Sequence, residues 1–138
     1  MLLQSLGFYL KSLILCALML PLSGCFTTTA LHSPFQGVLA VDADKKATES
    51  AIMKAGALRG WVMTKNAQGE IIGELDNKGH YVKVKFTYND KTVVAYYLDS
   101  RNMDYNGTKI HKKYHMWLST FFREVNKVLK NSPTQKTA

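Results

Sequence analysis

Residues 81–88 read YVKVKFTY, and this stretch decides the fold class. Its side chains alternate along the chain, so that one face carries Val82, Val84, Phe86 and Tyr88 and the other carries Tyr81, Lys83, Lys85 and Thr87. A period of two predicts a β-strand with one buried and one hydrated face, which is typical of an antiparallel sheet.

Three further segments have the composition of strands and occur at nearly even intervals around this one: residues 59–64, 70–75 and 92–99. The segments between them, residues 66–69, 76–79 and 89–91, are rich in Asn, Asp and Gly, which favour turns. These connections are too short for a crossover helix. The sequence therefore predicts a four-stranded antiparallel meander and excludes a doubly wound parallel sheet.

A helix is expected on each side of the four strands. In residues 42–58, alanines recur at helical spacing, Asp42 or Asp44 can cap the start, and Gly56 or Gly60 can mark the end. In residues 110–130, a wide apolar stripe contains Tyr114, Trp117, Leu118, Phe121, Phe122, Val125, Val128 and Leu129. Such stripes must be buried, so we predict an α+β two-layer sandwich of order α-β-β-β-β-α with both helices packed on one sheet face.

The N-terminus has the pattern of a secretory signal. Residues 12–22 read SLILCALMLPL, an apolar run shorter than the ~20 residues of a membrane-spanning helix. The small residues Ser23 and Gly24 follow, and then Cys25. This order predicts a signal peptide at residues 1–24 that is removed on export.

Leu22, Ser23, Gly24 and Cys25 resemble the lipobox of bacterial lipoproteins. The resemblance implies cleavage before Cys25, a diacylglycerol on its thiol and a palmitate or similar chain on its amine. Phe26 stands where an Asp would signal retention in the inner membrane, so we expect the outer membrane of a Gram-negative cell with the domain facing the periplasm. The alternative is an ordinary secretory signal followed by a chance cysteine.

The expected division of the chain is a signal peptide at 1–24, a lipid-anchored tether at 25–40, an α+β domain at 41–130 and a flexible tail at 131–138. Cys16 and Cys25 are the two cysteines. Removal of the signal and acylation of Cys25 would leave no thiol for a disulfide, a zinc site or a nucleophile.

Basic residues outnumber acidic ones, with 18 Lys and Arg against 10 Asp and Glu. Many of the basic residues fall between Lys78 and Lys113. A basic surface can bind lipopolysaccharide phosphates, peptidoglycan carboxylates or anionic lipid, whereas nucleic acid is not expected in the periplasm. The alternative is a solvated surface that maintains solubility.

Two residue combinations raise the question of catalysis. His111 and His115 are one turn apart on the predicted helix, but Lys112 stands where the helical zinc motif has Glu, so we expect neither metal nor cofactor. Asp99, Ser100 and His111 are the residue types of a hydrolase triad, but the segment lacks a nucleophile elbow. We instead expect Ser100, Asn102 and His111 to bond backbone groups around the loop after the fourth strand.

The segment 96–105, YYLDSRNMDY, together with Ile110-His111 and Tyr114-His115-x-Trp117-Leu118, resembles a family of small uncharacterised proteobacterial lipoproteins. The likeness spans about residues 52–125, and relatives more often carry Asn at the position of His115. It implies a lipobox signal and one α+β periplasmic domain, and it implies no activity.

From these observations we expect a non-catalytic envelope lipoprotein that binds a protein, glycan or anionic lipid. The candidate binding residues are Tyr81, Lys83, Lys85, Ser100, Asn102, Tyr105 and His111. One alternative is a periplasmic hydrolase or metal-dependent enzyme that uses Ser100, His111 and His115. Another is a structural accessory of an outer-membrane assembly with a contiguous apolar patch. The sequence leaves the oligomeric state open.

Overall fold

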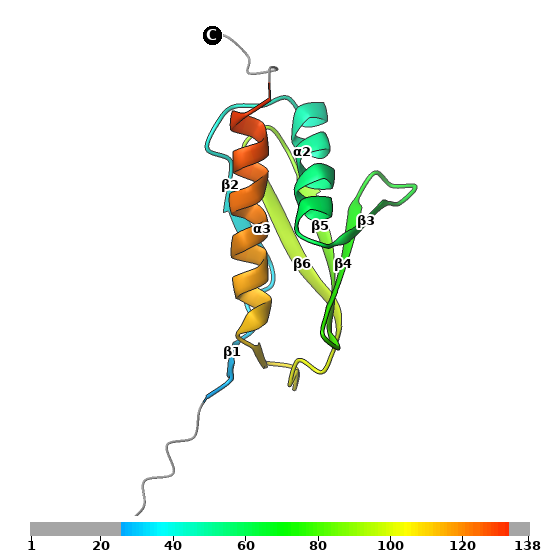
Figure 1. Ribbon diagram of the computed structural model, residues 1–138, viewed down its shortest axis with the longest axis vertical. Coiled ribbons are helices and arrows are strands. Elements are labelled where there is room, and N and C mark those ends of the chain that lie inside the picture. The colour runs from blue at the N-terminus through cyan, green and yellow to red at the C-terminus, as the bar shows by residue number, and fades with distance from the viewer. Residues whose placement is uncertain (1–25, 133–138) are drawn as a thin grey trace, which may run out of the picture.

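The computed structural model describes residues 26–132, so the predicted signal peptide at residues 1–24, Cys25 and residues 133–138 lie outside the described residues. The described chain forms an α+β fold, as predicted (Figure 1). Its elements follow in the order β1 (Thr28–Ala30), β2 (Phe35–Val38), α2 (Lys45–Leu58), β3 (Val62–Lys65), β4 (Ile71–Asn77), β5 (His80–Tyr88), β6 (Thr92–Arg101), β7 (Lys109–His111) and α3 (Lys113–Lys130).

The main sheet has five strands in the order β2-β6-β5-β4-β3, and every neighbouring pair is antiparallel. Strands β3 to β6 follow their sequence order, and β2 joins the free edge of β6. The turn between β4 and β5 contains only Lys78 and Gly79, both with positive φ, at 54° and 82°. This geometry matches the right-handed twist of the paired strands, and Gly at the second position adopts it without steric cost.

The described part of residues 25–40 contains two strands, which corrects our expectation that this segment is a tether. Strand β2 pairs with β6, and Thr28 to Ala30 in β1 pair with Lys109 to His111 in β7. These strands are only three and four residues long, too short to show an alternating pattern by themselves. Their pairing partners lie far away in the chain, so tertiary context determines them. The sheet consequently has five strands rather than four.

Both helices lie on the same side of the main sheet (Figure 1). Helix α2 begins after Asp44, whose carboxylate accepts a hydrogen bond from the Ala47 amide at 2.7 Å. This is one of the two predicted caps. Helix α3 begins at Lys113 rather than at residue 110, because Ile110 and His111 belong to β7.

The core lies between the helices and the sheet, and the alternation of β5 is as predicted. Val82, Val84 and Phe86 are fully buried, and the Phe86 ring stacks on Phe121 of α3 with centroids 4.6 Å apart. Trp117 is only partly buried at the border of this core, so the apolar stripe of α3 is centred on Leu118 and Phe121. Neither helix of residues 26–132 combines the length and apolar character needed to cross a bilayer.

Candidate binding surface

The side of the main sheet that faces away from the helices is the candidate binding surface, and we call it the open face. The strand register places on it the outward side chains of β3 to β6: Val62, Thr64, Ile72, Glu74, Tyr81, Lys83, Lys85, Thr87, Val94, Tyr96, Asp99 and Arg101. These residues are half-buried or exposed, whereas the residues between them in β4 and β5 are buried. Among the predicted site residues, Tyr81, Lys83 and Lys85 therefore share one surface.

Tyr81 is the centre of a polar cluster on the open face. Its hydroxyl donates a hydrogen bond to Glu74 Oε2 at 2.7 Å, and the Arg101 guanidinium lies over its ring, 4.1 Å from the centroid. Burial and the Glu74 carboxylate raise the pKa of Tyr81 to about 12. The hydrogen bond from Tyr81 lowers the pKa of Glu74. Tyr81 is therefore a neutral donor held in a fixed orientation, and it is unsuited to act as a base.

Both lysines of the open face are paired with acidic residues of β4 or the turn before it. Lys83 Nζ lies 3.4 Å from Glu74 Oε1, and Lys85 Nζ lies 3.0 Å from Glu70 Oε1. The Lys85 ammonium also lies 5.3 Å from the centroid of the Tyr96 ring. Glu74 and Glu70 thus balance the charges of Lys83 and Lys85 on the open face.

The other candidate residues hold the loop between β6 and β7. The Asn102 side-chain amide donates to the Gly79 carbonyl at 3.0 Å, and His80 Nδ1 contacts the Asn102 carbonyl oxygen. Ser100 Oγ and the Tyr97 hydroxyl share a hydrogen bond of 2.8 Å. The Tyr105 ring packs on the Tyr97 ring with centroids 4.6 Å apart. We expected Asn102 to bond a backbone group in the loop after the fourth strand, but the group that it bonds belongs to the turn between β4 and β5.

The three residues of the hydrolase alternative have separate structural contacts. Ser100 bonds to Tyr97, His111 Nδ1 accepts from the Lys113 amide at 3.1 Å, and His115 Nε2 accepts from the His32 amide at 3.0 Å. We expected the two histidines to lie on one face of a helix. His111 instead lies in β7, so they do not.

Ring nitrogens that accept hydrogen bonds must be unprotonated. Burial lowers the pKa of both His111 and His115, and the positive charge of Lys113 lowers that of His111 further. Within residues 26–132, no group of three or more His, Cys, Asp or Glu side chains is placed to hold a metal ion.

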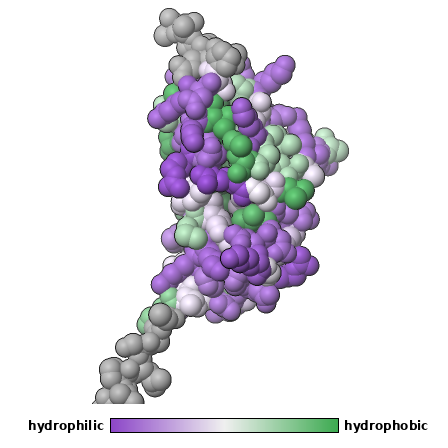
Figure 2. Space-filling model, viewed as in Figure 1, coloured by the Kyte–Doolittle hydropathy of each residue, from purple (hydrophilic) through white to green (hydrophobic). Residues whose placement is uncertain are grey.

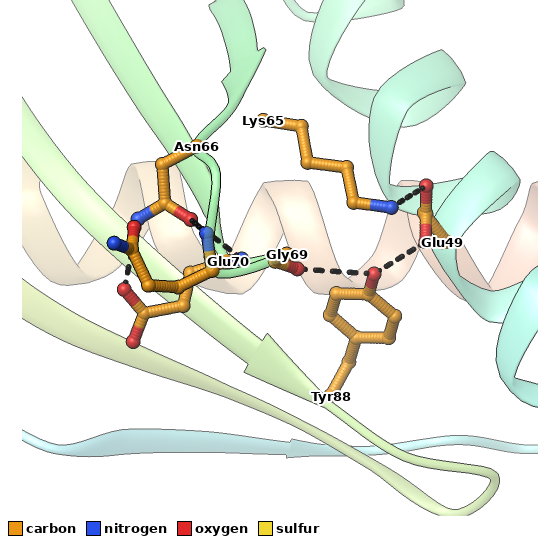
Figure 3. Close-up of polar contacts among 7 residues, drawn as sticks. Glu49, Lys65, Asn66, Gly69, Glu70 and Tyr88 are labelled. Atoms are coloured by element: carbon orange, nitrogen blue, oxygen red, sulfur yellow. Dashed lines mark hydrogen bonds and ion pairs between the residues drawn. The ribbon is translucent and has the colours of Figure 1, made fainter.

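Sequence reasoning did not single out a polar cluster at the other end of β5 (Figure 3). The Tyr88 hydroxyl donates to Glu49 Oε2 at 2.6 Å, and Lys65 Nζ lies 2.9 Å from Glu49 Oε1. Beside it, the Asn66 amide donates to Glu70 Oε2 at 2.9 Å. These contacts join α2, the end of β3 and β5. The sequence feature that could have indicated this cluster is Tyr88, whose hydroxyl lies on the buried face of an alternating strand and therefore needs a hydrogen-bond partner.

Two of the grooves that border α3 in residues 26–132 separate it from β2 and from α2. One lies between β2 and α3 and is lined by Gly37, Val38, Phe122, Arg123, Asn126 and Lys127 among others. The other lies between the two helices and includes Lys54, Leu58, Glu124 and Val128. Figure 2 shows a hydrophobic band between hydrophilic side chains over the helices. Among the described residues, these grooves do not include the nucleophile and base candidates Ser100, His111 and His115.

Comparison of the chain with known protein families, curated proteins and solved structures yields no match.

Proposed function

We propose that the protein is a non-catalytic, lipid-anchored lipoprotein of the Gram-negative outer membrane whose open face binds another envelope protein in the periplasm. In this proposal the domain is a two-layer sandwich, and the partner occupies the sheet face that the helices leave uncovered. The observation that carries the proposal is the pair of half-buried Tyr81 and exposed Arg101 on that face, surrounded by paired charges.

The lipid anchor is supported by the sequence Leu22-Ser23-Gly24-Cys25 directly after an apolar run. The position of the first strand supports it as well, because β1 begins at Thr28, just beyond Cys25. The first strand of the described chain thus lies just after the position at which the resemblance to a lipobox places the start of the mature chain. Two or three acyl chains hold a protein stably at a membrane.

A protein partner fits the chemistry of the open face better than an anionic lipid does. Tyr and Arg are enriched among residues that contribute most to protein–protein binding. Here Tyr81 and Arg101 are stacked before binding, so less side-chain entropy is lost when a partner contacts them. An anionic bilayer would be attracted by a basic excess, but Glu70 and Glu74 balance Lys85 and Lys83.

The structural contacts of Ser100, His111 and His115 support a non-catalytic role. A nucleophile requires a general base within hydrogen-bonding reach, but the partner of Ser100 Oγ is the Tyr97 hydroxyl. Burial raises the pKa of Tyr97, which keeps its hydroxyl protonated at neutral pH. Tyr97 therefore cannot take a proton from Ser100 under those conditions.

Site-specific photo-crosslinking in cells tests the proposed function. A photoreactive phenylalanine derivative replaces Tyr96 on the open face or, as a matched control, Lys54 on α2. We expect the Tyr96 probe to form a protein adduct that Arg101→Glu abolishes, while Lys46→Glu on α2 leaves it unchanged.

Equal adducts from both probe positions, or an adduct insensitive to Arg101→Glu, would contradict the assignment of the open face. An adduct that muramidase digestion removes would identify peptidoglycan instead and would contradict a protein partner.

A further inference from the structure

We infer that the domain stands on the membrane, with the end that carries β1, β7 and the start of α3 resting on anionic lipid headgroups. This inference rests on the proposed acylation of Cys25 and adds the orientation of the domain. We call this region the anchor-side end and define it by Phe26, Tyr105, Lys109, Lys112, Lys113 and Met116.

The short link between Cys25 and the fold restricts the orientation. Only Phe26 and Thr27 separate Cys25 from β1. Three residues of fully extended chain span at most ~11 Å. The Lys112 amide donates to the Thr27 carbonyl at 2.9 Å, so the fold already holds the chain two residues after Cys25. Acyl chains on Cys25 would therefore bring the anchor-side end to the bilayer surface.

The pairing of β1 with β7 determines which residues lie at this end. Thr28 is opposite His111 in the antiparallel pair, so the chain leading back to Cys25 emerges beside Lys112 and the start of α3. Figure 1 shows β1, β7, the loop before β7 and the first turn of α3 together at the lower end of the domain. This is the end from which the N-terminal chain leaves the fold.

The charges of the anchor-side end suit an anionic surface. Lys109 and Lys112 are exposed and Lys113 is half-buried, whereas Asp104 is the acidic residue between positions 102 and 116. Basic residues therefore outnumber acidic ones in this segment, by three to one. Each Lys or Arg near an anionic membrane surface contributes about 1 kcal/mol of attraction, which corresponds to about a fivefold change in binding.

The same end also exposes apolar and aromatic side chains. Phe26 is 83% exposed, Met116 is 56% exposed and Tyr105 is 42% exposed. Lys112 is the N-cap of α3 and has helical backbone angles, so Met116, one turn later, lies on the same side of the helix. Apolar and aromatic groups beside cationic side chains are the combination that the headgroup region of a bilayer accommodates.

The inferred orientation leaves the open face accessible. Strand β5 runs from His80 near the anchor-side end to Tyr88 at the opposite end, so the main sheet would stand upright on the membrane (Figure 1). Its open face would then point sideways into the periplasm, where the proposed protein partner can reach it.

Fluorescence quenching of the full lipidated protein in vesicles tests the orientation. One variant carries a fluorophore at Met116→Cys in the anchor-side end, and the control carries it at Lys91→Cys in the turn between β5 and β6. The vesicles contain phosphatidylethanolamine with or without phosphatidylglycerol, and a spin label on the lipid headgroup acts as the quencher. We expect several-fold stronger quenching at position 116 than at 91 when phosphatidylglycerol is present.

A second pair of variants tests the lysines. The first variant combines Lys109→Gln, Lys112→Gln and Lys113→Gln. Each lysine that is removed should lower the ratio of docked to undocked domain about fivefold. The matched control, Lys46→Gln with Lys54→Gln and Lys91→Gln, should leave that ratio unchanged when measured with the position 116 probe.

The outcomes separate this inference from the proposed function. The intact mass of each preparation is first measured by mass spectrometry. A chain without acyl groups would contradict the lipid anchor and, with it, the orientation. An acylated protein that is quenched equally at positions 116 and 91 overturns the orientation alone. Quenching at 116 that neither phosphatidylglycerol nor the lysine substitutions change overturns the role of the anionic headgroups.

Discussion

Gly37 in β2 lies so close to Phe122 in α3 that a β-carbon on residue 37 would come within 2.6 Å of Phe122 Cγ. The Phe122 ring also stacks on Phe35, with centroids 5.8 Å apart. Glycine at position 37 thus allows the edge strand to pack directly against the helix. This contact makes the segment after Cys25 part of the fold.

Gly37→Ala should therefore destabilise the domain by about 1–3 kcal/mol, because Phe122 or the strand must move to accommodate the methyl group. Thermal melts of the two proteins measure this. Gln36→Ala, on the other face of the same strand, is the control and should have little effect. An unchanged melting temperature for Gly37→Ala would show that β2 is not packed and that residues 25–40 act as a tether after all.

Tyr114→Phe should leave the free energy of unfolding unchanged or raise it by up to about 1 kcal/mol. Within residues 26–132, the Tyr114 hydroxyl is buried and has no hydrogen-bond partner, so its removal relieves a desolvation cost. Tyr97→Phe is the matched comparison, because it removes the hydrogen bond to Ser100 and should lower the free energy of unfolding. A loss of more than about 1 kcal/mol in Tyr114→Phe would reveal a partner for that hydroxyl.

Tyr88→Phe should destabilise the domain by about 1 kcal/mol at neutral pH, since it removes the hydrogen bond to Glu49. That bond is the largest cause that lowers the pKa of Glu49 below its ordinary value of 4.5. The stabilisation is present above this value and is lost as the pH falls through the lower pKa of the folded state. Urea melts at neutral and acid pH should show the two proteins converging in stability at acid pH, and a constant difference would contradict the assignment.

His111→Asn should remove part of the loss of stability that acid causes. The pKa of His111 is lowered in the fold, so the unfolded chain binds a proton first as the pH falls below 6.5. The folded domain therefore loses stability through that range, and protonation also removes the acceptor for the Lys113 amide. Asn keeps an acceptor but does not titrate.

Denaturant melts across this pH range, with His111→Ala for comparison, measure the effect. His111→Ala should cost about 1 kcal/mol at neutral pH, because it removes the acceptor. A pH dependence in His111→Asn equal to that of the unsubstituted protein would show that another group is responsible.

The α+β class, both helices and the alternation of β5 could be predicted because local patterns determine them. The apolar residues Val82, Val84 and Phe86 alternate with the period of a strand, and Asp44 is of a residue type that is common at helix N-caps. Strands β1, β2 and β7 could not be predicted, since residues as far apart as Thr28 and His111 must pair before either strand exists.

Part of the candidate binding surface was also predictable. The period of β5 places Tyr81, Lys83 and Lys85 on one face. The balance of charge on that face was not predictable, because it depends on the register that sets Glu74 beside Lys83. The gathering of Lys109, Lys112 and Lys113 at one end of the domain was not predictable either, since the fold separates Lys112 from Lys85, although both belong to the same basic stretch of sequence.

The lipid anchor on Cys25 is the central claim of this account, and the intact mass of the protein purified from native membranes tests it most directly. We expect a chain that begins at Cys25 and carries the added mass of a diacylglycerol and one further acyl chain. Cys25→Ser should give a protein that keeps residues 1–24 and has no added mass. A mature chain that begins at another residue, or one that begins at Cys25 without acyl groups, would contradict the account.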